Sequence, residues 1–287
     1  MRVDTAIKEA VLTLKNVKIA SFNLDTKILM AHVLKISIQD LVLYHQQSEL
    51  SLENYQKYKE LINSRCKKIP VSHLIKKREF YNNVFMVNNF VLDPRPDSET
   101  LIELIINKFP QNSSINLCEI GCGSGCLIIS LLKNFKNWKG TAIDISSNAL
   151  EVSKINAKTH EVFDKIDFIN SNIFSQISPL NQFDLIISNP PYIPTNDIEN
   201  LQDEVRLYEP RLALDGGIDG LNFYREIADN SSKFLNENGK IFVEIGYNQF
   251  NEVKNIFLQK NYCLSDYKKD LNGYIRSLEF SKNIFLP

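Results

Sequence analysis

The stretch at residues 188–192 reads Ser-Asn-Pro-Pro-Tyr, and its residue types suit the binding of a planar NH2 group. The side-chain carbonyl of Asn189 can accept one N–H, and the backbone carbonyl of Pro190 can accept the other. The ring of Tyr192 can lie against the flat face of the bound group. Two acceptors localise electron density on a weakly nucleophilic nitrogen and aim it at an electrophile held nearby. The stretch therefore predicts group transfer to an amide or amino nitrogen.

A glycine-rich turn at residues 121–125 has the order Gly-x-Gly-x-Gly and forms a second functional motif. Glycines there let the backbone approach a ligand closely, and the spacing differs from the Gly-x-Gly-x-x-Gly that seats a pyrophosphate. Asp144 can accept hydrogen bonds from the two hydroxyls of a ribose, and Glu119 suits a ligand with an ammonium group. A ribose and a cation without phosphate describe S-adenosylmethionine. The residues predicted to contact it are Glu119, Gly121, Cys122, Gly123, Ser124, Gly125 and Asp144.

Both motifs fall on an alternation of strands and helices that begins near residue 113. Strands are expected at 115–120, 141–145, 166–169, 183–187 and 240–245, helices at 124–135, 147–158 and 221–235, and a closing antiparallel pair at 262–267 and 274–280. This alternation predicts a mainly parallel sheet with helices on both faces. The motifs follow the carboxyl ends of strands, which is where open α/β sheets bind ligands.

The chain before this alternation has a different character. Apolar residues recur at helical spacing over residues 1–70 and predict a small helical bundle, with Ser51 as the N-cap of one helix. Two short β-prone runs flank Asn82 and Asn83 and predict a hairpin with its turn at these two residues. Next, Asp97 or Ser98 is expected to cap a helix that runs through Phe109. We therefore expect a helical domain at 1–70, a β-hairpin linker at 71–93 and a cofactor-binding domain at 94–287.

Composition argues against several other classes of protein. The 287-residue chain has a formal net charge of -1, which gives no sign of nucleic-acid binding. No apolar run approaches the ~18 residues that a membrane span needs, and the first residues do not form a signal peptide, so we expect a cytoplasmic location. Five cysteines, an odd number, argue against a disulfide framework. Cys118, Cys122 and Cys126 are spaced by four, but their side chains should diverge, and we expect no metal.

Taken together, these residues resemble the HemK/PrmC family of protein-glutamine N-methyltransferases, which modify peptide chain release factors. The similar segments are Pro-Arg-Pro-Asp-Ser-Glu at 94–99, the strand and loop at 183–193, Tyr-Glu-Pro-Arg-Leu-Ala-Leu at 208–214 with the glycines after it, and Glu-Ile-Gly at 244–246 with Gln249. The resemblance implies a Rossmann-like class I S-adenosylmethionine-dependent methyltransferase domain with a seven-stranded sheet. It also implies that the N-terminal helical domain helps to engage the release factor.

The same resemblance implies roles for individual residues. S-adenosylmethionine would also contact Asn172, Ile173 and Asn189, and S-adenosylhomocysteine would be the product. The glutamine of a Gly-Gly-Gln loop would be held by Asn189, Pro190, Pro191 and Tyr192, and the catalytic residues would be Asn189, Pro190 and Tyr192. We expect a monomer with no nucleic-acid or membrane partner. Three positions depart from the family pattern: Lys76 stands where glycine is usual, Asp93 where an apolar residue is common, and Asn172 where aspartate is common.

Three other functions compete with this interpretation. A nucleic-acid methyltransferase could use the same stretch on the amino group of adenine or guanine, although such enzymes usually carry a basic surface or a target-recognition domain. A nicotinamide-dependent oxidoreductase is disfavoured by the spacing of the glycines. A non-catalytic binding module should have lost a site residue, and none of the expected ones is missing.

Overall fold

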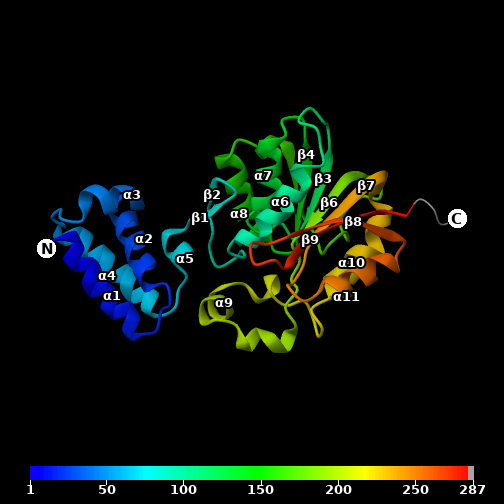
Figure 1. Ribbon diagram of the computed structural model, residues 1–287. Helices are drawn as coiled ribbons and strands as arrows, with labels where there is room; N and C mark the ends of the chain where they lie inside the picture. Colours follow the sequence, from blue (N-terminus) through cyan, green and yellow to red (C-terminus); the bar gives the residue numbers. More distant parts are fainter. Residues whose placement is uncertain (284–287) are drawn as a thin grey trace. The chain divides into compact units, whose positions relative to one another are not determined.

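The computed structural model describes residues 1–283, and the chain forms two compact units (Figure 1). The helical unit contains Met1–Lys77 and also Gln202–Tyr208, a segment far away in the sequence. The sheet unit contains Arg78–Leu201 and the chain from Glu209 onward. Nothing in the sequence pattern indicated that residues 202–208 would join the helical unit.

The helical unit is a small bundle around one apolar core that includes Leu14, Leu29, Met30 and Tyr58. Ser51 accepts a hydrogen bond from the backbone N–H of Asn54 at 3.2 Å, so the predicted N-cap is confirmed. The helices are α1 (Val3–Asn16), α2 (Phe22–Leu34), α3 (Ile38–Asp40), a π-helical turn (Leu41–His45), α4 (Leu52–Cys66), α5 (Val71–Ile75) and α9 (Asp203–Tyr208).

A buried arginine ties the inserted segment to the bundle. The side chain of Arg65 in α4 is 1% exposed, and its Nε lies 2.7 Å from Asp25 Oδ2 in α2. Its Nη2 lies 2.6 Å from Glu204 Oε1 in α9. At the end of α9, the hydroxyl of Tyr208 donates to the carbonyl of Lys67 at 2.6 Å. A buried cation thus receives one carboxylate from the bundle and one from the inserted segment.

The sheet unit begins with the predicted hairpin, formed by β1 (Arg78–Phe80) and β2 (Asn83–Phe85). The turn lies at Tyr81 and Asn82, with φ of 44° and 56°, so the predicted turn at Asn82 and Asn83 is wrong by one residue. A tertiary contact explains the shift. The N–H of Tyr81 donates to Glu99 Oε1 at 2.9 Å and is therefore not available for the hydrogen bonds between β1 and β2.

Seven strands form the main sheet in the order β5-β4-β3-β6-β7-β9-β8 (Figure 1). All of the predicted strands are present. β9 runs antiparallel to both β7 and β8, as expected for a closing antiparallel pair, and the other pairings in this sheet are parallel. The order reverses between β3 and β6, which makes their carboxyl ends a topological switch point. The strands are β3 (Asn116–Ile120), β4 (Lys139–Asp144), β5 (Ile166–Asn170), β6 (Phe183–Ser188), β7 (Leu235–Glu244), β8 (Tyr262–Lys269) and β9 (Ile275–Lys282).

Helices cover both faces of this sheet, as predicted (Figure 1). One core cluster joins α6 (Glu99–Ile106), α7 (Cys126–Asn134) and α8 (Ser147–Thr159) to the sheet around the buried Trp138. The other joins α10 (Asn222–Asn230) and α11 (Phe250–Leu258) around Tyr224. Short 3-10 turns lie at Pro96–Ser98, Phe163–Lys165, Thr195–Asn200, Arg211–Ala213 and Ser231–Lys233.

Several predicted helix ends are wrong. Gly125 takes a left-handed φ of 77°, so the helix expected from residue 124 starts at Cys126. The helix expected to reach Phe109 ends at Ile106, where the chain enters a turn in which the Lys108 N–H donates to the Ile105 carbonyl at 2.9 Å. The helix expected to reach Leu235 ends at Asn230, because Leu235 already pairs with Phe183 in the sheet. Within residues 1–283, no helix has the length and hydropathy to cross a membrane.

Candidate active site

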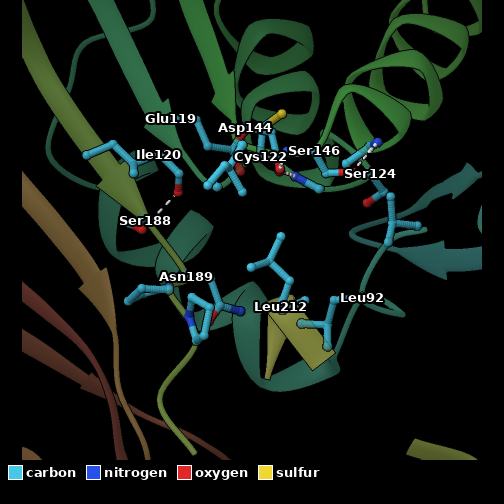
Figure 2. A pocket seen from close by; sticks show the side chains of 18 of the residues that line it. Leu92, Glu119, Ile120, Cys122, Ser124, Asp144, Ser146, Ser188, Asn189 and Leu212 are labelled. Carbon is cyan, nitrogen blue, oxygen red and sulfur yellow. Dashed lines mark hydrogen bonds between the residues drawn. The ribbon is translucent and has the colours of Figure 1, made fainter. Parts of the chain in front are cut away.

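The loops after β3, β4, β5 and β6 line one pocket, together with residues from the segments at 90–98 and 210–213 (Figure 2). This pocket lies at the switch point of the sheet, so the fold brings the two predicted motifs together. Two of the predicted residues, Gly125 and Tyr192, are not among those that line it. The predicted residues that do are Glu119, Gly121, Cys122, Gly123, Ser124, Asp144, Asn172, Ile173, Asn189, Pro190 and Pro191.

The glycine turn bends sharply away from the end of β3. Gly123 has a φ of 53°, and a Cβ built on it would meet no atom within 4 Å, so its backbone faces open space. Gly125 serves packing instead, because a Cβ there would lie 2.3 Å from Ser153 Oγ in α8. The turn therefore exposes backbone at Gly123, where a ligand can approach, and Gly125 allows the turn to pack closely against α8.

Asp144, the last residue of β4, joins two of the pocket loops. Its Oδ2 accepts the N–H of Gly123 at 2.8 Å, and its Oδ1 accepts the N–H of Ser146 at 2.9 Å. Burial raises the pKa of this carboxyl above its ordinary value, while the backbone donors oppose that shift. Each carboxylate oxygen can accept more than one hydrogen bond, so two ribose hydroxyls can still donate to the group.

Glu119 lies one strand away and is almost fully buried at 1% exposure. Its Oε2 accepts the N–H of Ile128 in the first turn of α7 at 3.0 Å, so the carboxyl holds the start of that helix. Burial raises the pKa of Glu119 well above its ordinary value. The residue predicted to face an ammonium group thus also fixes α7 against the pocket.

Asn189 follows directly after β6 and is oriented by a serine from another element. Its Nδ2 donates to Ser98 Oγ at 3.0 Å, and no described residue donates to its Oδ1. Just before it, the hydroxyl of Ser188 donates to the carbonyl of Ile120 at 2.9 Å and locks the ends of β3 and β6 together (Figure 2). Ser98, expected only as a helix cap, makes no capping bond and orients Asn189 instead.

Tyr192 is held behind the pocket by partners that the sequence reasoning gave no role. Gln249 Nε2 donates to the Tyr192 carbonyl at 3.0 Å, and Arg276 Nη2 donates to the Tyr192 hydroxyl at 3.2 Å. A Cβ on Gly220 would lie 2.4 Å from the same carbonyl, so glycine is required there by close packing. These contacts fix the path of the chain after Asn189. In the sequence, Gln249 was noted only as part of the family resemblance, and Arg276 was not noted.

Comparison with known proteins identifies the family. A family model described as the PrmC N-terminal domain matches residues 5–75, and one described as the methyltransferase small domain matches residues 95–205. A protein from Clostridium acetobutylicum named release factor glutamine methyltransferase is 35% identical over 271 residues, which cover 94% of this chain and 95% of that protein. The chain belongs to the PrmC/HemK family of release factor glutamine methyltransferases. The resemblance noted from the motifs is confirmed.

Two other relatives describe the fold and the length. A bifunctional methyltransferase from Rickettsia bellii is 36% identical over 305 residues, and the match covers 97% of this chain but 54% of that protein. The chain thus spans about half the length of that relative. The crystal structure of a methyltransferase from Pyrococcus furiosus aligns with a TM-score of 0.54 at 18% identity over 77% of this chain and 99% of that one. This likeness confirms the class I methyltransferase fold.

Such a family and fold imply S-adenosylmethionine, and the pocket residues fit it. The open backbone at Gly123 leaves room for a ligand, and the Asp144 carboxylate retains acceptor capacity for a ribose. Ile173 has a φ of 50°, which is strained for a β-branched residue and typical of a functional loop. Asn172, one of the three departures from the family pattern, also lines the pocket.

The other two departures have a structural explanation. Lys76 has a φ of 55° at the carboxyl end of α5, a conformation that favours glycine. Asp93 is buried, and its Oδ2 lies 3.6 Å from Arg78 Nη1, so this charge replaces an apolar residue with an ion pair. Of the three cysteines spaced by four, Cys118 packs into one core cluster, whereas Cys122 and Cys126 both pack into the other. Within residues 1–283, no group of three or more His, Cys, Asp or Glu could hold a metal ion.

Proposed function

We propose that this chain transfers a methyl group from S-adenosylmethionine to the side-chain amide nitrogen of the glutamine in the Gly-Gly-Gln motif of peptide chain release factors. The match over 94% of the chain to a protein named release factor glutamine methyltransferase carries the proposal. The location of the Asn-Pro-Pro-Tyr stretch at the switch point of the sheet agrees with it. A substrate amide that receives a methyl group has two N–H donors, and this stretch can offer each of them a hydrogen-bond acceptor.

The proposed mechanism is positioning. S-adenosylmethionine supplies, when bound, an electrophilic methyl group. The glycine turn and Asp144 would hold it, and Asn189 Oδ1 and the Pro190 carbonyl would each accept one N–H of the substrate amide. These acceptors localise the nitrogen lone pair toward the methyl group. A methylated amide nitrogen is cationic and loses its proton readily, so no strong general base is needed in this step.

The helical unit is proposed to engage the release factor. Its match to the PrmC N-terminal domain model supports a role specific to this family. The division into a recognition domain at 1–70, a linker at 71–93 and a methyltransferase domain at 94–287 remains a prediction.

Mass spectrometry tests the function directly. Purified release factor is incubated with the chain and S-adenosylmethionine, and the tryptic peptide that contains Gly-Gly-Gln is sequenced. We expect one added methyl group on the glutamine, and none when the release factor carries Gly-Gly-Ala instead. Methylation of nucleic acid in a parallel reaction, with an unmodified release factor, would overturn the proposal in favour of an adenine or guanine amino-group methyltransferase.

A further inference from the structure

Glu244 is a buried carboxylate for which the proposed mechanism has no use. It is the last residue of β7, the strand next to β6, and it is 0% exposed. Neither of its carboxylate oxygens has a hydrogen-bond partner of good geometry among residues 1–283. Arg276 Nη2 lies 3.6 Å from Oε1. Burying such a group is unfavourable, so its presence calls for a functional explanation.

Arg276 Nη2 lies 3.3 Å from Asp97 Oδ2 and 3.6 Å from Glu244 Oε1, so Glu244 lies beside the turn that carries Ser98. Ser98 and Asn189 are near enough for their donors to favour the charged form of Glu244. Asn189 Nδ2 donates to Ser98 Oγ at 3.0 Å. A serine hydroxyl that accepts one hydrogen bond still has its own proton to donate. Ser98, which already accepts from Asn189, can therefore turn its own proton toward Glu244.

Charged and titratable groups face Glu244 from several elements. Burial raises the pKa of Glu244 to about 7, and the nearby Arg276 guanidinium opposes that shift while the Asp97 carboxylate adds to it. The backbone carbonyl of Glu244 is held by the Tyr224 hydroxyl at 2.9 Å. The groups that face the carboxylate are Arg276 on β9, Asp97 in the turn before α6, Tyr192 after β6, Tyr224 on α10 and the Cys126 thiol on α7.

We propose that ionised Glu244 is a positioning residue that accepts the Ser98 hydroxyl proton and thereby keeps the Asn189 amide turned with Nδ2 inward and Oδ1 toward the substrate. This inference rests on the proposed amide methylation. A protonated Glu244 is a weaker acceptor and can itself donate to Ser98 Oγ, which frees the Ser98 proton to turn toward Asn189. The Asn189 amide then rotates and presents its NH2 group to the NH2 group of the substrate. Two donors face each other, and the nitrogen is no longer held for transfer.

The pH dependence of turnover tests this order of donors. Because the ionised form is the active one, wild-type kcat should rise with pH through about 7. Glu244→Gln is neutral at every pH and cannot titrate, so its kcat should stay flat across the same range. Glu244→Ala should lower kcat by about 10–100-fold, the range for removing a partner that orients a reacting group. S-adenosylmethionine affinity, measured by calorimetry, should change little in either variant.

Glu279 supplies a matched control. It is also 0% exposed in the sheet unit, but it pairs with Lys240 and Lys108. Glu279→Gln should therefore keep the wild-type pH profile. A Glu244→Gln enzyme that retains the wild-type rise, or a Glu244→Ala enzyme with wild-type kcat, would overturn the inference. Failure of the wild-type enzyme to modify the release factor would instead overturn the proposed function.

Discussion

In the proposed mechanism the side-chain amide of Asn189 makes hydrogen bonds to two partners. Its nitrogen donates to Ser98, and in the proposed mechanism its oxygen accepts an N–H of the substrate amide. The side chain can therefore fill this role in only one of its two amide orientations, although exchanging Oδ1 and Nδ2 hardly changes its shape. Under the proposal, a residue after β6 depends on a serine from the turn before α6 and on an acid at the end of β7.

Asn189→Ala should separate turnover from cofactor binding. The substitution removes one of the two acceptors for the substrate amide, and we expect kcat to fall by ~10²-fold or more, the scale for one preorganised polar contact. S-adenosylmethionine affinity should fall much less. Steady-state kinetics with release factor and calorimetry with S-adenosylmethionine measure the two effects. A wild-type rate in this variant would contradict the assignment of the acceptor site.

Asp144→Ala should have the opposite profile. Loss of hydrogen bonds to a charged group should weaken S-adenosylmethionine binding by about 1.5–3 kcal/mol, as measured by calorimetry. Since both carboxylate oxygens also accept backbone N–H groups, Asp144→Asn serves as a control that keeps the shape and one acceptor. Unchanged affinity in a folded Asp144→Ala variant would remove Asp144 from the cofactor site.

Sequence reasoning reached only part of this site, for a physical reason. Asp144 ends one buried strand and Asn189 follows another, so the strand pattern alone indicated where they would lie. Ser98, Glu244 and Arg276 come from three separate segments, and only the folded sheet brings them together. Ser98 was expected as a helix cap, because a serine before a helix looks the same whether it caps the helix or holds another side chain.

At the scale of elements, strands were predicted better than helix ends. A buried strand has to be apolar along its length, so its residues mark it directly. A helix ends where backbone conformation changes, and tertiary contacts often decide that point. The left-handed conformation of Gly125 delays the start of α7, and the start of β7 at Leu235 leaves less chain for α10. Apolar periodicity reveals neither effect.

Lys76 offers a test at this scale. Its φ of 55° is unfavourable for a residue with a Cβ, so Lys76→Gly should stabilise the helical unit by about 1 kcal/mol. Lys67 caps the end of α4 with a φ of -82°, so Lys67→Gly should bring no such gain. Hydrogen exchange of the α2 and α4 amides compares the two variants. Equal or greater stabilisation by Lys67→Gly would show that backbone conformation at residue 76 is not the cause.

At the scale of the whole molecule, the helical unit is completed by the segment at 202–208. Arg65→Ala leaves the buried Asp25 without its cation and removes the partner of Glu204. We expect the unit to lose about 3–5 kcal/mol, the usual result of breaking a buried pair. Arg2→Ala, which breaks an exposed pair with Asp4, should lower stability by about 0–1 kcal/mol.

Hydrogen exchange and kinetics measure the outcome of Arg65→Ala together. Faster exchange should be confined to the helical unit, the KM for release factor should rise, and S-adenosylmethionine affinity should be unchanged. If cofactor affinity falls as well, the two units do not act independently. An unchanged KM in a variant with a loosened helical unit would remove that unit from release factor recognition.

The position of Glu204 in the chain also has a consequence for the order of synthesis. Glu204 follows Arg65 by 139 residues. At a synthesis rate of ~5–20 residues per second, that separation takes roughly 7–28 s. During this time Arg65 has Asp25 but lacks its second carboxylate, and the face that α9 will occupy is uncovered. The helical unit can therefore be completed by Glu204 only after residues 189–192 have been synthesised.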